Sequence, residues 1–203
     1  MKLVVFGATG NTGLALLEQA TKLGHQVTAF ARSTDKLAGI PNIAIVTGSI
    51  FDEAQVTSAI RGHDAVLSCL GTRPWRHENI CSDGTRVIAK AMAATGVKRL
   101  VVLSTQGAGD SEVGTLAKPF ASLILGRAFR DKEVMERELE ATTLDWIVVR
   151  PGLLSNAKGR GSWRVSTTNE LKGGKIARAD VATFMLQQLD SRDYVGKRPV
   201  VVW

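Results

Sequence analysis

Short apolar runs alternate with amphipathic segments along most of the chain, and the changes of pattern fall at glycines, prolines or polar clusters. Apolar, β-branched runs predict buried strands, whereas apolar residues spaced three and four apart predict helices. The predicted strands are residues 3–6, 27–32, 43–46, 65–71, 99–105, 146–150 and 199–203. The predicted helices are residues 14–23, 55–60 and 84–95, one from Pro119 or Arg130 to Ala141, and one from Arg178 or Asp180 to Leu189.

Strands and helices therefore alternate, which is typical of a parallel sheet covered by helices on both faces. We expect an α/β protein of the Rossmann type, with a doubly wound parallel sheet in a three-layer α/β/α arrangement. The 203 residues suit one domain, and we find no repeat or linker. The last portion, about residues 153–203, is too short for a second full domain and is expected on the substrate side.

A glycine-rich turn follows the first predicted strand. Gly7, Gly10 and Gly13 have G-x-x-G-x-x-G spacing, and a helical pattern begins at Leu14. Small residues let backbone N–H groups approach a pyrophosphate, and the helix dipole favours its negative charge. The alternative is a tight turn without a ligand. The predicted cofactor-binding residues of this turn are Gly7, Thr9, Gly10, Asn11, Thr12 and Gly13.

The end of the second predicted strand indicates which dinucleotide binds. An NAD site usually has an acidic residue about 20 residues beyond the glycines, which holds the ribose 2′-hydroxyl. Here Arg32 lies 19 residues after Gly13, followed by Ser33 and Lys36, and Asp35 lies beyond the expected acidic position. A guanidinium and an ammonium suit a 2′-phosphate. We therefore expect NADP(H) in preference to NAD(H); the alternative is that Arg32 is only a solvated strand end.

Composition limits the remaining classes of function. The formal net charge of +7 is dispersed, without a basic run longer than two residues, so a surface serving an anionic cofactor explains it and nucleic-acid binding is not expected. No run approaches membrane-spanning length. Two cysteines and three scattered histidines have no metal-ligand spacing, so we expect no metal site. With only two cysteines and no export signal expected, we expect a cytoplasmic location. We expect a monomer or a weak homodimer.

Five stretches together resemble one known group. They are GATGNTG (7–13), LGTR (70–73), VKRLVVLST (97–105), DKEVMERELEATTLDWIVVRPG (131–152) and ARADVATFML (177–186). The chain resembles, over almost its whole length, the atypical short-chain dehydrogenases/reductases that include the NmrA-like proteins and the biliverdin reductase B (flavin reductase) family. This NAD(P)-binding family implies a Rossmann fold and reductase activity.

The resemblance also implies a set of ligand contacts. The glycine loop with Thr12 would hold the pyrophosphate, and Arg32 and Lys36 the 2′-phosphate. Ser49 and Ile50 would lie along the adenine, although the family often has Asp in place of Ser49. Leu70, Gly71 and Arg73 would flank the adenosine and the phosphates. The implied nicotinamide contacts are Ser104, Thr105, Lys132, Pro151, Gly152, Leu153 and Leu154.

The residues offer several candidates for the catalytic group. The larger branch of the superfamily uses Tyr-x-x-x-Lys for proton transfer. The only tyrosine here is Tyr194, near the C-terminal end, so this pair is excluded. The remaining candidates are Ser104, Thr105 and Lys132. Consecutive strand residues point to opposite faces, so Ser104 and Thr105 are not both expected to face the nicotinamide. Lys132 contacts the ligands or pairs with Glu136 along a helix.

These residues predict an NADPH-dependent reductase of planar acceptors. Hydride transfer to a flavin, a quinone or a biliverdin-like tetrapyrrole needs mainly orientation, so a site without a strong acid is compatible with it. FMN or FAD would then be a substrate. Trp75 and Trp163 are candidates to stack on the acceptor, or else they pack against the domain edge. The alternative functions are a non-catalytic NADP(H)-binding redox sensor and, less compatible with the missing tyrosine, a sugar epimerase or dehydratase.

Overall fold

The computed structural model describes residues 1–71, 79–109 and 118–203. Within these residues the helices are α1 (Asn11–Lys22), α2 (Glu53–Ile60), α3 (Ile80–Thr95), α4 (Lys118–Glu140) and α5 (Arg178–Gln187). The strands are β1 (Lys2–Phe6), β2 (Gln26–Ala31), β3 (Ile43–Thr47), β4 (Ala65–Ser68), β5 (Arg99–Leu103), β6 (Asp145–Pro151), β7 (Leu153–Ser155), β8 (Arg164–Ser166), β9 (Lys175–Ala177) and β10 (Val200–Val202).

One central sheet carries the fold, with the strand order β3-β2-β1-β4-β5-β6-β10-β8. All neighbouring strands in it are parallel except β10 and β8, which are antiparallel at one edge. The strand order reverses direction at β1, because β2 lies on one side of it and β4 on the other. A separate parallel pair, β7 and β9, follows the end of β6. The predicted doubly wound α/β fold is therefore confirmed.

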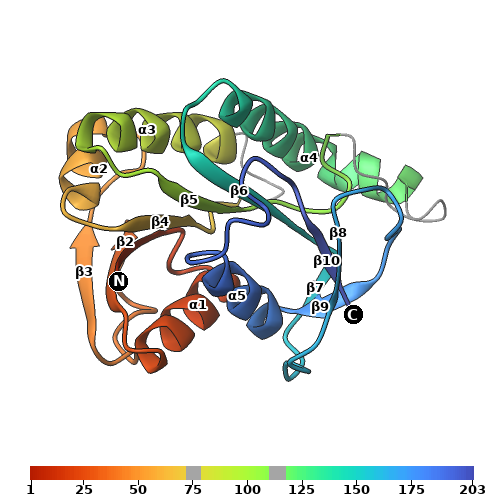
Figure 1. The fold of residues 1–203 in the computed structure, drawn as a ribbon, viewed down its shortest axis with the longest axis horizontal. Helices are drawn as coiled ribbons and strands as arrows, with labels where there is room; N and C mark the ends of the chain where they lie inside the picture. Colours follow the sequence, from red (N-terminus) through yellow and green to blue (C-terminus); the bar gives the residue numbers. More distant parts are fainter. Residues whose placement is uncertain (72–78, 110–117) are drawn as a thin grey trace.

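The helices cover both faces of the sheet, so the molecule has three layers (Figure 1). Helices α1 and α5 pack on one face in a core cluster that includes Leu16 and Val181. Helices α2, α3 and α4 pack on the other face around Ile88, Met92 and Leu139. Residues of β1 alternate between the two clusters, as expected for a strand buried on both faces.

Helix α3 begins at Ile80, four residues before the predicted start at Gly84. The extra turn is stabilised from a distant element. The Asp131 carboxylate, on α4, accepts the backbone N–H groups of Cys81 and Ser82, each at 2.9 Å. A local sequence pattern does not contain this cap, because its acceptor is 50 residues away. The predicted start of this helix was therefore wrong.

The start of one further helix agrees with the sequence pattern, whereas three short strands were missed. Helix α4 begins at Lys118, which agrees with the earlier of its two predicted starts and places Pro119 in the first turn, where proline is tolerated. The three-residue strands β7, β8 and β9 were not predicted. Each is too short to show a two-residue periodicity, so its pairing is set by tertiary contacts.

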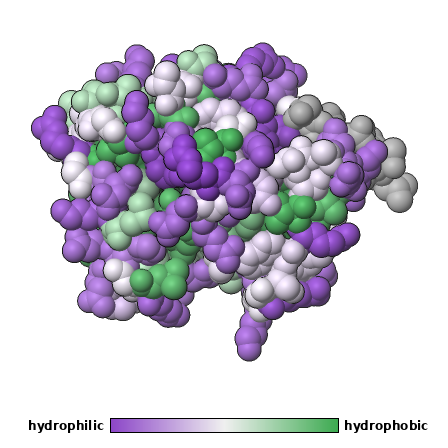
Figure 2. Space-filling view, viewed as in Figure 1, coloured by the Kyte–Doolittle hydropathy of each residue, from purple (hydrophilic) through white to green (hydrophobic). Residues whose placement is uncertain are grey.

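The surface in Figure 2 is mixed, with polar residues around small apolar areas. The large hydrophobic side chains that the described residues leave exposed are Met1, Leu23, Ile45, Phe51 and Leu153. Among the described helices, none combines the length and the apolar character needed to cross a membrane.

Candidate functional site

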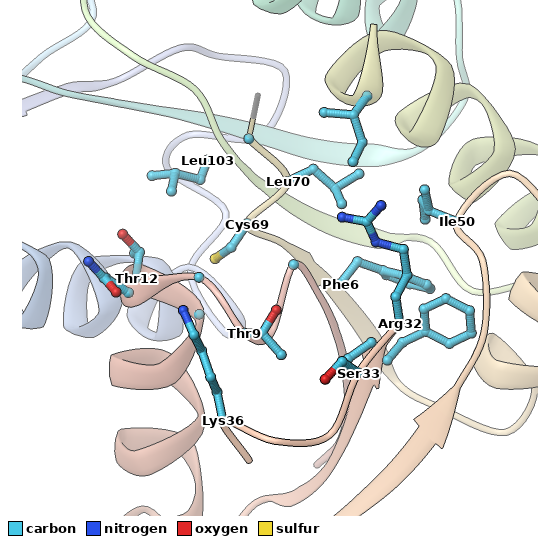
Figure 3. Close-up of a pocket in the computed structure, with 18 of the residues that line it drawn as sticks. Phe6, Thr9, Thr12, Arg32, Ser33, Lys36, Ile50, Cys69, Leu70 and Leu103 are labelled. Carbon is cyan, nitrogen blue, oxygen red and sulfur yellow. The ribbon is translucent and has the colours of Figure 1, made fainter. Parts of the chain in front are cut away.

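A cavity of about 760 Å³ lies at the carboxyl ends of β1, β2, β4 and β5 (Figure 3). Open α/β sheets bind ligands at such a place, where the strand order reverses. Its volume is in the ordinary range for small-molecule and cofactor sites. The cavity is lined by Phe6, Gly7, Thr9, Gly10, Asn11, Thr12, Gly13, Phe30, Ala31, Arg32, Ser33, Asp35, Lys36, Gly48, Ile50, Cys69, Leu70, Gly71, Ile80, Leu103, Leu154 and Arg178.

The glycine turn requires glycine at two positions. Gly7 has φ +70°, and a Cβ there would lie 2.4 Å from the backbone oxygen of Cys69. A Cβ on Gly13 would lie 2.4 Å from the backbone oxygen of Gly7. The turn is therefore packed directly against the backbone that follows β4 on one side and against the start of α1 on the other. Because glycine has no side chain, a ligand can approach the main chain closely at this turn.

The first turn of α1 is open to an anion. Its N-cap residue, Gly10, has no side chain to accept the first backbone N–H groups, and the turn contains no acidic residue. Asn11, Thr12 and Gly13 line the cavity at this point. Unsatisfied N–H groups and the positive end of the helix dipole favour a phosphate. The predicted pyrophosphate loop therefore fits such a group.

Cations gather at the end of β2. Arg32, Ser33 and Lys36, all predicted cofactor contacts, line the cavity, and all three are exposed. In Figure 3, Lys36 extends toward the glycine loop, and the guanidinium of Arg32 points toward the side formed by Ile50 and Leu70. Asp35 also lies in the wall, so the local formal charge is one positive unit. This arrangement leaves Arg32 available for a ligand anion.

An apolar wall continues from this end of the cavity. Ile50 is 5% exposed and Leu70 is 7% exposed, and both line the cavity together with Phe30. Ser49, the other predicted adenine contact, is not in the wall. Its backbone N–H donates to Gln55 Oε1 at 2.9 Å. The structure thus brings Ile50 to the cavity and places Ser49 in the turn before α2.

Ser104 belongs to a buried ionic network on the α4 side of the sheet. It is 3% exposed, and its hydroxyl donates to Glu136 Oε1. The same carboxylate accepts from Arg150, and its Oε2 lies 3.4 Å from Nε of Arg198. A buried carboxylate needs such partners to compensate for desolvation. The Ser104 hydroxyl is therefore committed to Glu136 and does not line the cavity.

Thr105 and Lys132 lie beside the end of β5 without being part of the cavity wall itself. Thr105 is half-buried, and its hydroxyl donates to the backbone oxygen of Gln106 at 3.2 Å. The ammonium of Lys132 donates to the backbone oxygen of Leu103 at 2.9 Å. Leu103 itself lines the cavity. Lys132 is therefore directed toward the end of β5 rather than toward Glu136, its neighbour one turn along α4.

Cys69 lines the cavity between the glycine turn and Leu103. Burial raises the pKa of its thiol to about 12, and the positive charge of Lys132 acts in the opposite direction. The desolvation of the thiolate is the larger effect, so the side chain is a neutral thiol near pH 7. Cys69 therefore behaves as an inert wall residue.

Other predicted contacts lie elsewhere. Of residues 151–154, only Leu154 lines the cavity; Leu153 is 75% exposed, and Pro151 is paired with β10. Trp163 packs edge-on against Phe184, with ring centroids 6.1 Å apart, in agreement with the packing alternative. Arg73 and Trp75 lie outside the described residues.

Sequence reasoning missed several wall residues. Phe6, Cys69 and Leu103 lie at strand ends, and the rule that ligands bind at the carboxyl ends of parallel strands was a signal for them. Arg178 had no comparable signal, because strand β9, which precedes it, was not predicted. No group of three or more His, Cys, Asp or Glu within residues 1–71, 79–109 and 118–203 is arranged to hold a metal ion.

Comparisons with known proteins agree with this geometry. Residues 7–192 match the NAD(P)H-binding family, and the chain belongs to that family. It is 29% identical over 202 residues to the UPF0659 protein YMR090W of Saccharomyces cerevisiae, covering 93% of this chain and 87% of the relative.

Two solved structures share the fold. The ChuY anaerobilin reductase of Escherichia coli superimposes with a TM-score of 0.87 at 24% identity, over all of this chain and 97% of that one. A Veillonella parvula short-chain dehydrogenase/reductase in complex with NADP has a TM-score of 0.84 at 14% identity, over all of this chain and 94% of that one. Together with the family match, these findings show an NAD(P)H-binding protein with a fold that these solved structures share.

Proposed function

We propose that the protein is an NADPH-dependent reductase that delivers hydride to a planar acceptor such as a flavin, a quinone or a biliverdin-like tetrapyrrole. One observation carries the proposal. A single cavity joins an uncapped glycine turn to the cations Arg32 and Lys36 and ends in the apolar side chains of Leu103 and Leu154. The first part suits NADP(H), and the last part suits a flat, apolar ring.

The cations favour NADP(H) over NAD(H). A guanidinium forms two parallel hydrogen bonds to a phosphate, and Lys36 adds a point charge. An NAD site would instead place a carboxylate at the end of β2. The NADP complex of the Veillonella parvula relative supports this choice.

The acceptor class follows from the missing catalytic tyrosine. Tyr194 is the only tyrosine of the chain, and its ring packs 5.9 Å from that of Phe184, away from the wall. A ketone would need an acid for its developing alkoxide, whereas a flavin or quinone ring spreads the charge that it receives. The description of ChuY as an anaerobilin reductase supports an acceptor of this planar kind.

The side chains at the reacting end would orient the rings and leave protonation to water. Bound NADPH would supply the hydride. Leu103 and Leu154 would hold the acceptor against it, and we assign Thr105 rather than Ser104 to this end because Ser104 is hydrogen-bonded to buried Glu136. Lys132 would support the end of β5 through the backbone oxygen of Leu103.

A second function, a non-catalytic redox sensor that binds NADP(H), is favoured by the same missing tyrosine. An acceptor panel of FMN, FAD, a soluble quinone and biliverdin, assayed with NADPH and NADH in parallel, separates the two. The reductase predicts steady NADPH oxidation with at least one acceptor. A sensor predicts different affinities for NADPH and NADP⁺ with negligible turnover, and that outcome would overturn the proposal.

A further inference from the structure

Arg178 is a charged residue of the cavity wall that is neither at the pyrophosphate loop nor at the expected 2′-phosphate position. It is the first residue of α5 and follows β9 directly. The other cations of the wall, Arg32 and Lys36, lie at the end of β2. Strand β2 is separated from β6 by three strands of the sheet, and β7, the partner of β9, follows β6. Arg178 therefore supplies positive charge to the opposite, reacting end.

The short strands β7 and β9 place Arg178 beside Asn156. They are parallel, and Ser155 is paired with Ala177, so the next residues of the two chains are Asn156 and Arg178. A terminal nitrogen of the Arg178 guanidinium donates to Asn156 Oδ1 at 2.7 Å. This pair occupies the carboxyl ends of two parallel strands, the kind of position at which α/β proteins bind ligands.

The backbone around Arg178 is held from both sides. The Gln19 side chain on α1 donates to the backbone oxygen of Ala179 at 2.8 Å and accepts from the hydroxyl of Thr183 at 2.8 Å. The carboxylate of Asp180 accepts from the backbone N–H of Gly161 at 3.0 Å. The Gln19 contacts fix the start of α5 relative to α1, and the Asp180 contact joins it to the loop at Gly161. The backbone that carries Arg178 is therefore held in place without a ligand, and the bond to Asn156 orients the guanidinium.

The guanidinium itself keeps most of its hydrogen-bonding capacity. Arginine has five N–H donors, and the partner of Arg178 among the described side chains is a neutral amide. The residue is half-buried and shares the cavity wall with Leu103 and Leu154. A partly desolvated guanidinium next to an apolar surface suits a ligand that has an apolar body and an anionic substituent.

We propose that Arg178, oriented by Asn156, binds a carboxylate or phosphate group of the acceptor. This inference rests on the proposed reductase function and narrows its substrates to anionic planar molecules. The cofactor already has positions for its own anions, because the open turn of α1 suits the pyrophosphate and Arg32 suits the 2′-phosphate. The anion that Arg178 recognises thus belongs to the second ligand.

FMN and riboflavin test this directly, because they share one ring system and differ by a phosphate. In the wild-type protein saturated with NADP⁺, we expect FMN to bind more tightly than riboflavin, as measured by flavin fluorescence. Arg178→Gln should weaken FMN binding by about 10-fold or more, the size expected for a charge-assisted hydrogen bond, and leave riboflavin binding unchanged. Lys175→Gln removes an exposed positive charge from β9 outside the wall and serves as the matched control.

Three results would overturn the inference. They are equal wild-type affinities for the two flavins, equal losses for both flavins in Arg178→Gln, and weakened binding of NADPH alone in that variant, which would assign Arg178 to the cofactor. The readout is binding, so it remains valid if turnover is absent. Turnover with both riboflavin and FMN would support the reductase function. The role of Arg178 would still be decided by the binding measurements.

Discussion

Replacing Arg32 by glutamine should selectively weaken NADPH binding. Arg32 lies in the cavity wall and is exposed, and Lys36 is the other cation at this end. Hydrogen bonds to charged groups contribute roughly 1.5–3 kcal/mol, which corresponds to about a 10- to 150-fold loss of affinity for the 2′-phosphate. NADH has no such phosphate, so its affinity should change by less than about 2-fold, a small fraction of that free energy.

Replacing Arg32 by aspartate should weaken NADPH binding further than replacing it by glutamine. Arg32→Asp would place a second carboxylate beside Asp35, which already lines the cavity, so repulsion adds to the lost hydrogen bonds. The new carboxylate would also accept the 2′-hydroxyl of NADH, as in NAD sites. We therefore expect the preference to reverse in favour of NADH.

The assay is a fluorescence titration of each reduced cofactor at low and at physiological salt. Screening should reduce the NADPH effect at higher salt, because Arg32 is exposed. Arg61→Asp makes the same charge change on an exposed residue outside the cavity wall and should alter neither affinity. Equal affinities of the parent protein for NADPH and NADH, or equal losses of both in Arg32→Asp, would refute the reasoning.

Three further predictions concern buried polar groups and the thiol near the site. Ser104→Ala should lower the free energy of unfolding, measured in urea, by about 1.5–3 kcal/mol, because buried Glu136 loses a hydrogen-bond donor. Turnover should fall less in Ser104→Ala than in Thr105→Val. A larger loss of turnover in Ser104→Ala would contradict the assignment of Thr105 to the reacting end. Asp131→Ala should cost about 1–3 kcal/mol by the same measurement, since the first turn of α3 loses its acceptor, and unchanged stability would argue against the cap. The pKa of the Cys69 thiol is raised to about 12, so native protein at pH 8 should react with iodoacetamide about 1000-fold more slowly at this thiol than the unfolded chain. The same raised pKa predicts that the free energy of unfolding falls as pH rises from about 9 toward 12, because the thiol loses its proton at a lower pH in the unfolded chain than in the folded one. Rapid alkylation of the native Cys69 thiol at pH 8 would contradict the raised pKa and both predictions made from it.

The features that the sequence predicted are those that depend on local pattern. The apolar runs identify the strands of the central sheet except the edge strand β8, and the glycine spacing identifies the turn after β1. Arg32 was found because the position that distinguishes the two dinucleotides lies at a known distance from the glycines. In each case neighbouring residues carry the information.

The features that were missed depend on contacts between distant residues. The first turn of α3 needs Asp131 from α4. Arg178 reaches the cavity because β9 pairs with β7 at the end of β6, and neither strand is long enough to show a periodic pattern. The sequence left open which of Ser104 and Thr105 faces the nicotinamide, and the bond of Ser104 to the buried carboxylate of Glu136 distinguishes them.

The most direct test of the proposed function is a single-turnover experiment on the complex with NADPH. The complex is mixed anaerobically with excess FMN or quinone, and the absorbance of the reduced nicotinamide is followed beside the same mixture without protein. We predict that one NADPH per protein is oxidised much faster than in the protein-free mixture, and more slowly when deuterium replaces the transferred hydrogen. Bound NADPH that is oxidised no faster than free NADPH by any acceptor of the panel would contradict the reductase function.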